Sequence, residues 1–113
     1  MSIIFERQDE TIWEPSGNTG KLFMHHITGL EQLLELPSGI HPSMDDTYEL
    51  SEEKLSAFTD ALIGYFKNTD NPNMHLLIDG ALVLLLRLHF GLSGNWKSEA
   101  PPALLAEAQT LSF

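Results

Sequence analysis

The residues that could carry chemistry in this chain include five histidines, none of which stands at the spacing of a familiar metal site. His25 and His26 are adjacent, so on a helix their side chains would point about 100° apart and could not chelate one ion together. The sequence contains no His-x-x-x-His and no His-Glu-x-x-His motif, which are spacings found in zinc sites. Because the chain also has no cysteine, thiolate ligands are excluded. We therefore expect no metal site and no cofactor.

A nucleophile or a phosphate-binding loop is no better supported. Ser38 lies in Pro-Ser-Gly and lacks the G-x-S-x-G turn that exposes a catalytic serine. The segment 17–21 is shorter than the phosphate-loop motif, and Leu22 stands where that motif has a hydroxyl. Asp45 and Asp46 are neighbours in an open segment, which is a poor position for a general acid. We therefore predict no catalytic residues and a protein that is not an enzyme.

The most concentrated chemical feature is a run of five acids within nine residues, Asp45–Glu53, with no base before Lys54. One interpretation is a solvated loop followed by the acidic first turn of a helix. The other is a docking surface, in which an exposed aromatic side chain is ringed by carboxylates. A second acidic group (Glu6, Asp9, Glu10 and Glu14) surrounds Trp13. In the docking interpretation the partner-binding residues are Asp45, Asp46, Tyr48, Glu49, Glu52, Glu53 and Trp13.

The charge balance limits the classes of partner. Sixteen acids against six bases give the 113-residue chain a formal net charge of −10. Such a surface repels phosphate backbones and anionic bilayers, so we expect no nucleic-acid partner and no membrane partner. It attracts cationic proteins, although acidity also serves solubility alone. The residues after Met1 do not form a basic and apolar leader, so we expect a cytoplasmic protein.

The element that should organise the fold is the segment Met74–Leu92, which is apolar on nearly every side. A helix of this composition is typical of the buried centre of a domain. A membrane span needs about twenty mostly apolar residues. Here Asp79 and Arg87 interrupt the segment, and its uninterrupted apolar run, Ala81–Leu86, has only six residues. We therefore predict a buried helix of a soluble domain.

Hydrophobic periodicity and turn residues define the other elements. The sequence predicts, in order, strands over Ser2–Arg7 and Glu10–Glu14, a helix from Asn18 or Thr19 to Glu35 or Leu36, a loop over Pro37–Leu50, and a helix capped by Ser51 that ends at Asn68–Pro72. The fold class is then mainly α (α+β), with three main helices arranged around the central apolar one and a small N-terminal β-hairpin. Residues 1–94 form a single globular domain. Residues 95–113 form a C-terminal tail with a short, weakly packed helix over Ala103–Gln109.

Several short motifs follow one another in an order that is also informative. They are T-I-W-E-P-S (Thr11–Ser16), L-P-S-G-I (Leu36–Ile40), D-D-x-Y-E-L (Asp45–Leu50) and L-I-D-G-A-L-V-L-L-L (Leu77–Leu86). With these motifs the chain from about Ile3 to Gly94 resembles an uncharacterised bacterial family, domain of unknown function 6086. The resemblance implies a bacterial origin and a shared fold, and it brings no activity with it. The tail after Gly94 lies outside the resemblance.

Together these features predict a small acidic bacterial interaction protein. The leading hypothesis is an immunity protein or antitoxin that binds and neutralises a basic toxin or effector domain, because an acidic inhibitor gains association rate from electrostatic steering. One alternative is a small-ligand-binding or regulatory domain, with a pocket between the hairpin and the helices near Trp13. Another is a structural subunit that self-associates as a homodimer to cover its apolar central helix.

Overall fold

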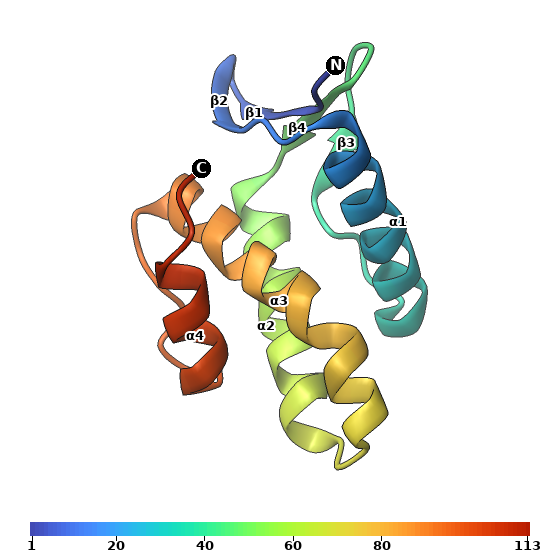
Figure 1. Ribbon diagram of the computed structural model, residues 1–113, viewed down its shortest axis with the longest axis vertical. Helices are drawn as coiled ribbons and strands as arrows, with labels where there is room; N and C mark the ends of the chain where they lie inside the picture. Colours follow the sequence, from blue (N-terminus) through green and yellow to red (C-terminus); the bar gives the residue numbers. More distant parts are fainter.

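A small four-stranded sheet lies at one end of the molecule, and the helices extend from it (Figure 1). Residues 1–113 are described by a computed structural model. The α+β class and the N-terminal hairpin are confirmed, whereas an arrangement of three main helices around a central one is not. The elements in chain order are β1 (Ile4–Arg7), β2 (Glu10–Trp13), α1 (Gly17–Leu34), β3 (Ile40–Pro42), β4 (Thr47–Leu50), α2 (Glu52–Asn68), α3 (Pro72–Ser93) and α4 (Pro102–Gln109).

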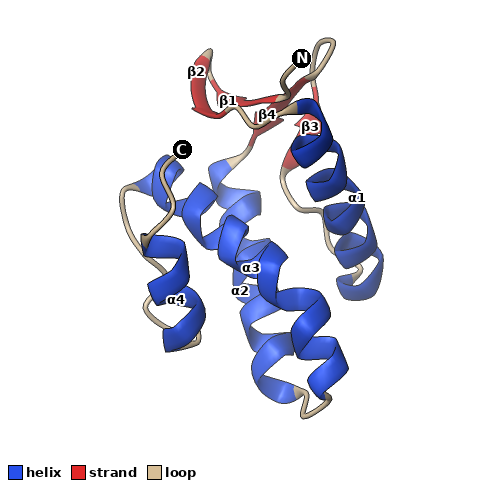
Figure 2. Cartoon of the chain, viewed as in Figure 1, coloured by secondary structure: helices blue, strands red, loops and turns tan.

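The sheet has the strand order β2-β1-β4-β3 (Figure 2). The predicted loop over Pro37–Leu50 is therefore wrong, because it contains the hairpin of β3 and β4. Ile40 pairs with Leu50 in that hairpin, and both side chains are buried. Strands this short display too few alternating positions to produce a clear period of two. β4 also pairs in parallel with β1, which joins the two hairpins into one sheet.

The first three helices, α1, α2 and α3, begin at side-chain caps. The hydroxyl of Ser16 accepts a hydrogen bond from the backbone N–H of Thr19, so α1 starts slightly before the predicted Asn18 or Thr19. Ser51 caps α2 as predicted, and the side chain of Asn71 caps α3. At the other end of α3, Gly94 adopts a left-handed conformation (φ 75°), which suits a residue without a Cβ atom.

The helix α3 packs against both α2 and α4, and nine of its residues are buried, eight of them hydrophobic. Leu55, Phe58 and Leu62 of α2 are fully buried with it. The C-terminal tail packs more closely than predicted, because Leu104 and Ala108 of α4 belong to the same hydrophobic core. A helix of only eight residues gains its stability from this contact and not from its own propensity.

One helix, α3, is long and apolar enough to cross a membrane when it is judged by length and composition alone. Half of its most apolar window is buried inside the protein, and the core helix of a soluble protein meets the same criterion. A single helix of this kind therefore does not argue for a membrane location.

The burial of α3 predicts a sharp difference between two of its leucines. Leu85 is completely buried and Leu76 is 74 % exposed. An unpaired charge at position 85 would cost several kcal/mol, a large part of the about 5–15 kcal/mol that stabilises a typical domain. We expect Leu85→Asp to abolish the cooperative thermal transition measured by circular dichroism, and Leu76→Asp to keep it. Equal melting temperatures for the two variants would contradict the central position of α3.

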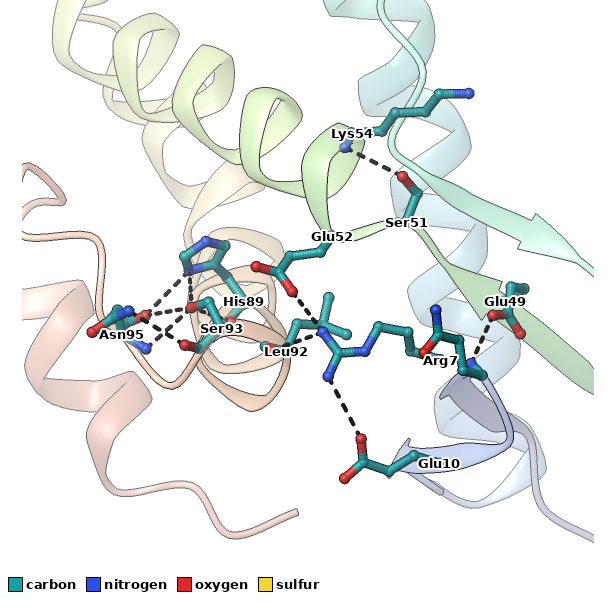
Figure 3. Close-up of polar contacts among 11 residues, drawn as sticks. Arg7, Glu10, Glu49, Ser51, Glu52, Lys54, His89, Leu92, Ser93 and Asn95 are labelled. Carbon is teal, nitrogen blue, oxygen red and sulfur yellow. Dashed lines mark hydrogen bonds and ion pairs between the residues drawn. The ribbon is translucent and has the colours of Figure 1, made fainter.

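A buried histidine at the end of α3 predicts a pH dependence of stability. His89 is 8 % exposed, and its Nδ1 lies 3.2 Å from the carbonyl oxygen of Asn95 (Figure 3). Burial and, to a smaller degree, the neighbouring Lys97 ammonium lower the pKa of His89 below its ordinary value of 6.5, against the opposing effect of Asn95, Glu52 and Asp60. The unfolded chain therefore binds a proton at a higher pH than the folded chain does.

It follows that the contribution of His89 to stability is complete above pH 6.5 and is lost as the pH falls below that value. Denaturant melts at a series of pH values measure this loss. His89→Asn keeps a neutral donor near the position of Nδ1, so we expect the free energy of unfolding to decrease less between pH 7 and pH 5 than in the wild type. The matched control is His41→Asn, which changes an exposed histidine. We expect this variant to show the same decrease in the free energy of unfolding as the wild type.

Candidate functional site: the acidic end of the sheet

The pairing of β1 with β4 brings together two acidic groups that lie far apart in the sequence. In this parallel pair Phe5 is aligned with Tyr48, and Glu6 is aligned with Glu49. Successive side chains in a strand point to opposite faces of the sheet. Phe5 is fully buried on the helix-facing side, so Glu6 and Glu49 lie next to each other on the outer face.

The outer face continues as a polar row across all four strands. Thr11 of β2 is aligned with Glu6, and His41 of β3 is aligned with Glu49. Thr11 and His41 are exposed, and the two glutamates are half-buried. The helices lie on the other side of the sheet, so this row faces solvent (Figure 2).

We call the acids of the four strands, their turns and the first turn of α2 the acidic end. The acidic end contains nine of the sixteen acids of the chain: Glu6, Asp9, Glu10, Glu14, Asp45, Asp46, Glu49, Glu52 and Glu53. The only base among these elements before Lys54 is Arg7. The negative charge of the molecule is therefore concentrated at the end that carries the sheet.

Arg7 holds part of the acidic end in place (Figure 3). Its guanidinium lies 2.5 Å from a carboxylate oxygen of Glu52 and 3.6 Å from one of Glu10. It also donates a hydrogen bond of 2.9 Å to the backbone carbonyl of Leu92 at the end of α3. The backbone N–H of Gln8 donates to the Glu49 carboxylate at 2.9 Å. Glu10, Glu49 and Glu52 thus each have a partner within the protein.

Five other acids of the acidic end have no side-chain partner within the protein: Glu6, Asp9, Asp45, Asp46 and Glu53. Asp9 and Asp46 lie at the hairpin turns with φ values of 68° and 57°, a left-handed conformation that aspartate adopts more readily than most residues. The two turns therefore present free carboxylates to solvent. Their charge remains available to a cationic partner.

The structure divides the acidic run that the sequence suggested. Asp45 and Asp46 precede β4, whereas Glu52 and Glu53 begin α2 beyond its other end. At about 3.3 Å per residue, the strand separates these two pairs by roughly 15–20 Å. What the sequence did not reveal was the position of Glu6 beside Glu49, because no local pattern predicts a pairing between residues more than forty positions apart.

The two aromatic candidates do not lie on the acidic face. Trp13 is 8 % exposed, with its ring stacked on Phe5 at 5.2 Å and on Phe113 at 4.7 Å. Tyr48 is half-buried and stacks on Phe5 at 5.4 Å. The expectation of an exposed aromatic side chain ringed by carboxylates is therefore not met. A role of either ring in partner binding stays a prediction.

Other kinds of site gain no geometric support. No group of three histidine, aspartate or glutamate side chains is arranged to hold a metal ion. Trp13 lines none of the hollows of the surface, so the pocket predicted between the hairpin and the helices near this residue is not found. The hollows lie instead along α1, and two of them are lined by residues of both α1 and α3.

The neighbouring carboxylates of Glu6 and Glu49 predict that electrostatic repulsion destabilises the sheet by a measurable amount. Like charges that lie side by side on adjacent strands destabilise a sheet, and Glu6 has no compensating partner. We expect Glu6→Gln to raise the free energy of unfolding by about 0.2–1 kcal/mol in low salt, and by less in high salt, which screens the repulsion. Urea melts at two salt concentrations measure this. Glu99→Gln removes an exposed acid away from the sheet, and an equal gain there would assign the effect to net charge alone.

Comparison with known proteins identifies the family of the chain. The chain belongs to a family of unknown function, DUF6086, whose family model matches residues 1–113. The match includes the tail after Gly94, which the resemblance in sequence motifs left out. No curated protein and no solved structure matches the chain.

Proposed function

We propose that this protein is a bacterial interaction protein of the immunity or antitoxin kind, which binds and neutralises a basic toxin or effector domain through its acidic end. The observation that carries the proposal is the gathering of nine of sixteen acids on the sheet, its turns and the start of α2. Five of these carboxylates are unpaired within the fold. An unpaired exposed acid contributes little to stability, so its charge is free to serve recognition.

A basic partner follows from the sign and the placement of the charge. Domains that cut or modify nucleic acids carry cationic surfaces, because they must bind a polyanion. An acidic surface of matching size competes for that cationic site and accelerates the encounter with it. Charges concentrated at one end also orient the approaching partner, which charges spread evenly over the molecule would not do.

A docked partner also needs apolar contact, and the β3–β4 turn offers it. Met44 is 80 % exposed and lies beside Asp45 and Asp46 at this turn. A methionine side chain is flexible and polarizable, so it adapts to an irregular apolar surface. We therefore assign the anchoring contact to Met44 in this proposal. The negative charges around it set the association rate.

The test uses charge-neutralising substitutions of unpaired acids. The triple variant Glu6→Gln, Asp45→Asn, Asp46→Asn removes three charges without removing a side-chain hydrogen bond or ion pair. A tagged wild-type chain is first used to capture a partner from the native host. Surface-binding kinetics at two salt concentrations then compare the proteins. We expect the triple variant to associate about tenfold more slowly at low salt, with a flatter salt dependence and a smaller change in dissociation.

The matched control is the triple variant Asp70→Asn, Glu99→Gln, Glu107→Gln. It has the same net charge as the first triple variant, but its changes lie outside the acidic end, at exposed positions. We expect it to associate at nearly the wild-type rate. Equal slowing by both triple variants, or by neither, would remove the acidic end from recognition.

A further inference from the structure

The four residues that follow α4 return to the sheet. Thr110–Phe113 have no regular secondary structure, because α4 ends at Gln109. In Figure 1 this segment runs from α4 back toward the hairpin of β1 and β2. The ring of Phe113 stacks on Trp13 of β2, with the ring centres 4.7 Å apart and the planes inclined by 13°. The segment thus links the C-terminal part of the fold to the first hairpin.

Phe113 is the cover that separates Trp13 from solvent. Two other rings contact the indole, since Phe5 stacks on it at 5.2 Å and Phe23 meets it edge-on at 5.3 Å. Both of these phenylalanines are buried in the core, whereas Phe113 is only half-buried. Removal of Phe113 would therefore expose Trp13, which is 8 % exposed when the ring is in place.

Few interactions hold this segment. The backbone N–H groups of Thr110 and Leu111 donate only to carbonyls of α4, and no backbone hydrogen bond reaches Ser112 or Phe113. Beyond α4, the polar contacts come from one side chain of α3. The Nε of Arg87 donates to the carbonyl of Leu111 at 3.1 Å, and its guanidinium lies 4.6 Å from the centre of the Phe113 ring. Segments with so few buried contacts open at a lower free energy than the core does.

Arg87 itself forms no ion pair that would lock the segment. Of the three half-buried bases, Arg7 and Lys97 each pair with carboxylates, and Arg87 pairs with none. Its contacts with Leu111 and Phe113 are a hydrogen bond to a neutral carbonyl and a cation–π interaction. Solvent can replace both when the segment leaves, because the Arg87 side chain is only half-buried. The contact is therefore of a kind that opens and closes reversibly.

We propose that Thr110–Phe113 form a latch, which covers Trp13 when it is closed and exposes the indole when it opens. The rest of the domain stays folded during this opening. The helix α4 remains in place, because Leu104 and Ala108 are buried in the common core and do not depend on the latch.

An open latch adds a surface for recognition at the border of the acidic end. Trp13 lies in β2, and the acids Glu10 and Glu14 at the two ends of this strand belong to the acidic end. Exposed tryptophan side chains are strong anchors in protein interfaces. This use of the latch rests on the proposed function. The latch itself is tested without any partner, so its failure and the failure of the proposed function are distinguishable.

The fluorescence of Trp13 reports the state of the latch. Trp96 is the other tryptophan, and Trp96→Phe removes its signal while keeping a ring next to Phe90. Quenching by acrylamide, which is neutral and so is not repelled by the acids, is measured across a urea series together with the helical circular dichroism. We expect quenching of Trp13 to rise at lower urea than the helical signal falls, because the latch opens before the domain unfolds. Coincident transitions would overturn the proposal.

Phe113→Ala in the same Trp96→Phe chain removes the cover. We expect it to shift the emission of Trp13 to longer wavelength and to raise the quenching constant without urea, with an unchanged helical signal. The early rise in quenching should then be lost. The matched control is Phe66→Ala, which removes a half-buried ring that stacks on His75 at the far end of α2. Equal quenching of Trp13 in the two variants without urea would overturn the covering role of Phe113.

A change on α3 tests the latch without altering its ring. Arg87→Lys keeps the positive charge but loses the planar guanidinium that stacks on Phe113 and the Nε that donates to Leu111. We expect the early rise in quenching to shift to lower urea. Ser112→Ala is the control, because Ser112 is exposed and forms no hydrogen bond, and it should leave this rise unchanged. An unchanged early rise in Arg87→Lys would overturn the assignment of Arg87 to the latch.

Discussion

The parallel pairing of β1 with β4 is the constraint on which the rest of the structure depends, and the side chain of Phe5 fixes it. Phe5 is fully buried and stacks between Trp13 of β2 and Tyr48 of β4, with the ring of Phe23 of α1 at its edge. The Phe5 side chain thus joins β1 to the neighbouring strand β2 and to two elements farther along the chain, α1 and β4. A shift of β1 by one residue would turn Phe5 into solvent and place Glu6 in the core, so the register is strongly specified.

The same register creates the acidic face. With Phe5 inside, Glu6 must lie on the outer face beside Glu49. Two like charges therefore lie side by side on this face of the parallel pair. Arg7 follows directly and points to the helix side, where it bridges Glu10, Glu52 and the carbonyl of Leu92. One cation therefore fastens the sheet to the start of α2 and to the end of α3. The fold thus pairs Glu10 and Glu52 with this cation, whereas the acids at the two hairpin turns have no partner.

The sequence was sufficient for the elements whose signals are local. The apolar segment of α3, the Ser51 cap of α2 and the N-terminal hairpin all follow from neighbouring residues. The hairpin of β3 and β4 was missed because a three-residue strand shows no resolvable period. The burial of Trp13 could not be predicted, since one of its stacking partners, Phe113, is the last residue of the chain.

The position of Phe113 also explains why the tail belongs with the rest of the fold. The guanidinium of Arg87 lies 4.6 Å from the centre of the Phe113 ring, and its Nε donates to the carbonyl oxygen of Leu111 at 3.1 Å. The tail thus provides partners for a cation of α3, which would be costly to bury alone. Sequence alone identified Arg87 as an interruption of the apolar segment and could not identify its partners in the tail, which lie more than twenty residues away.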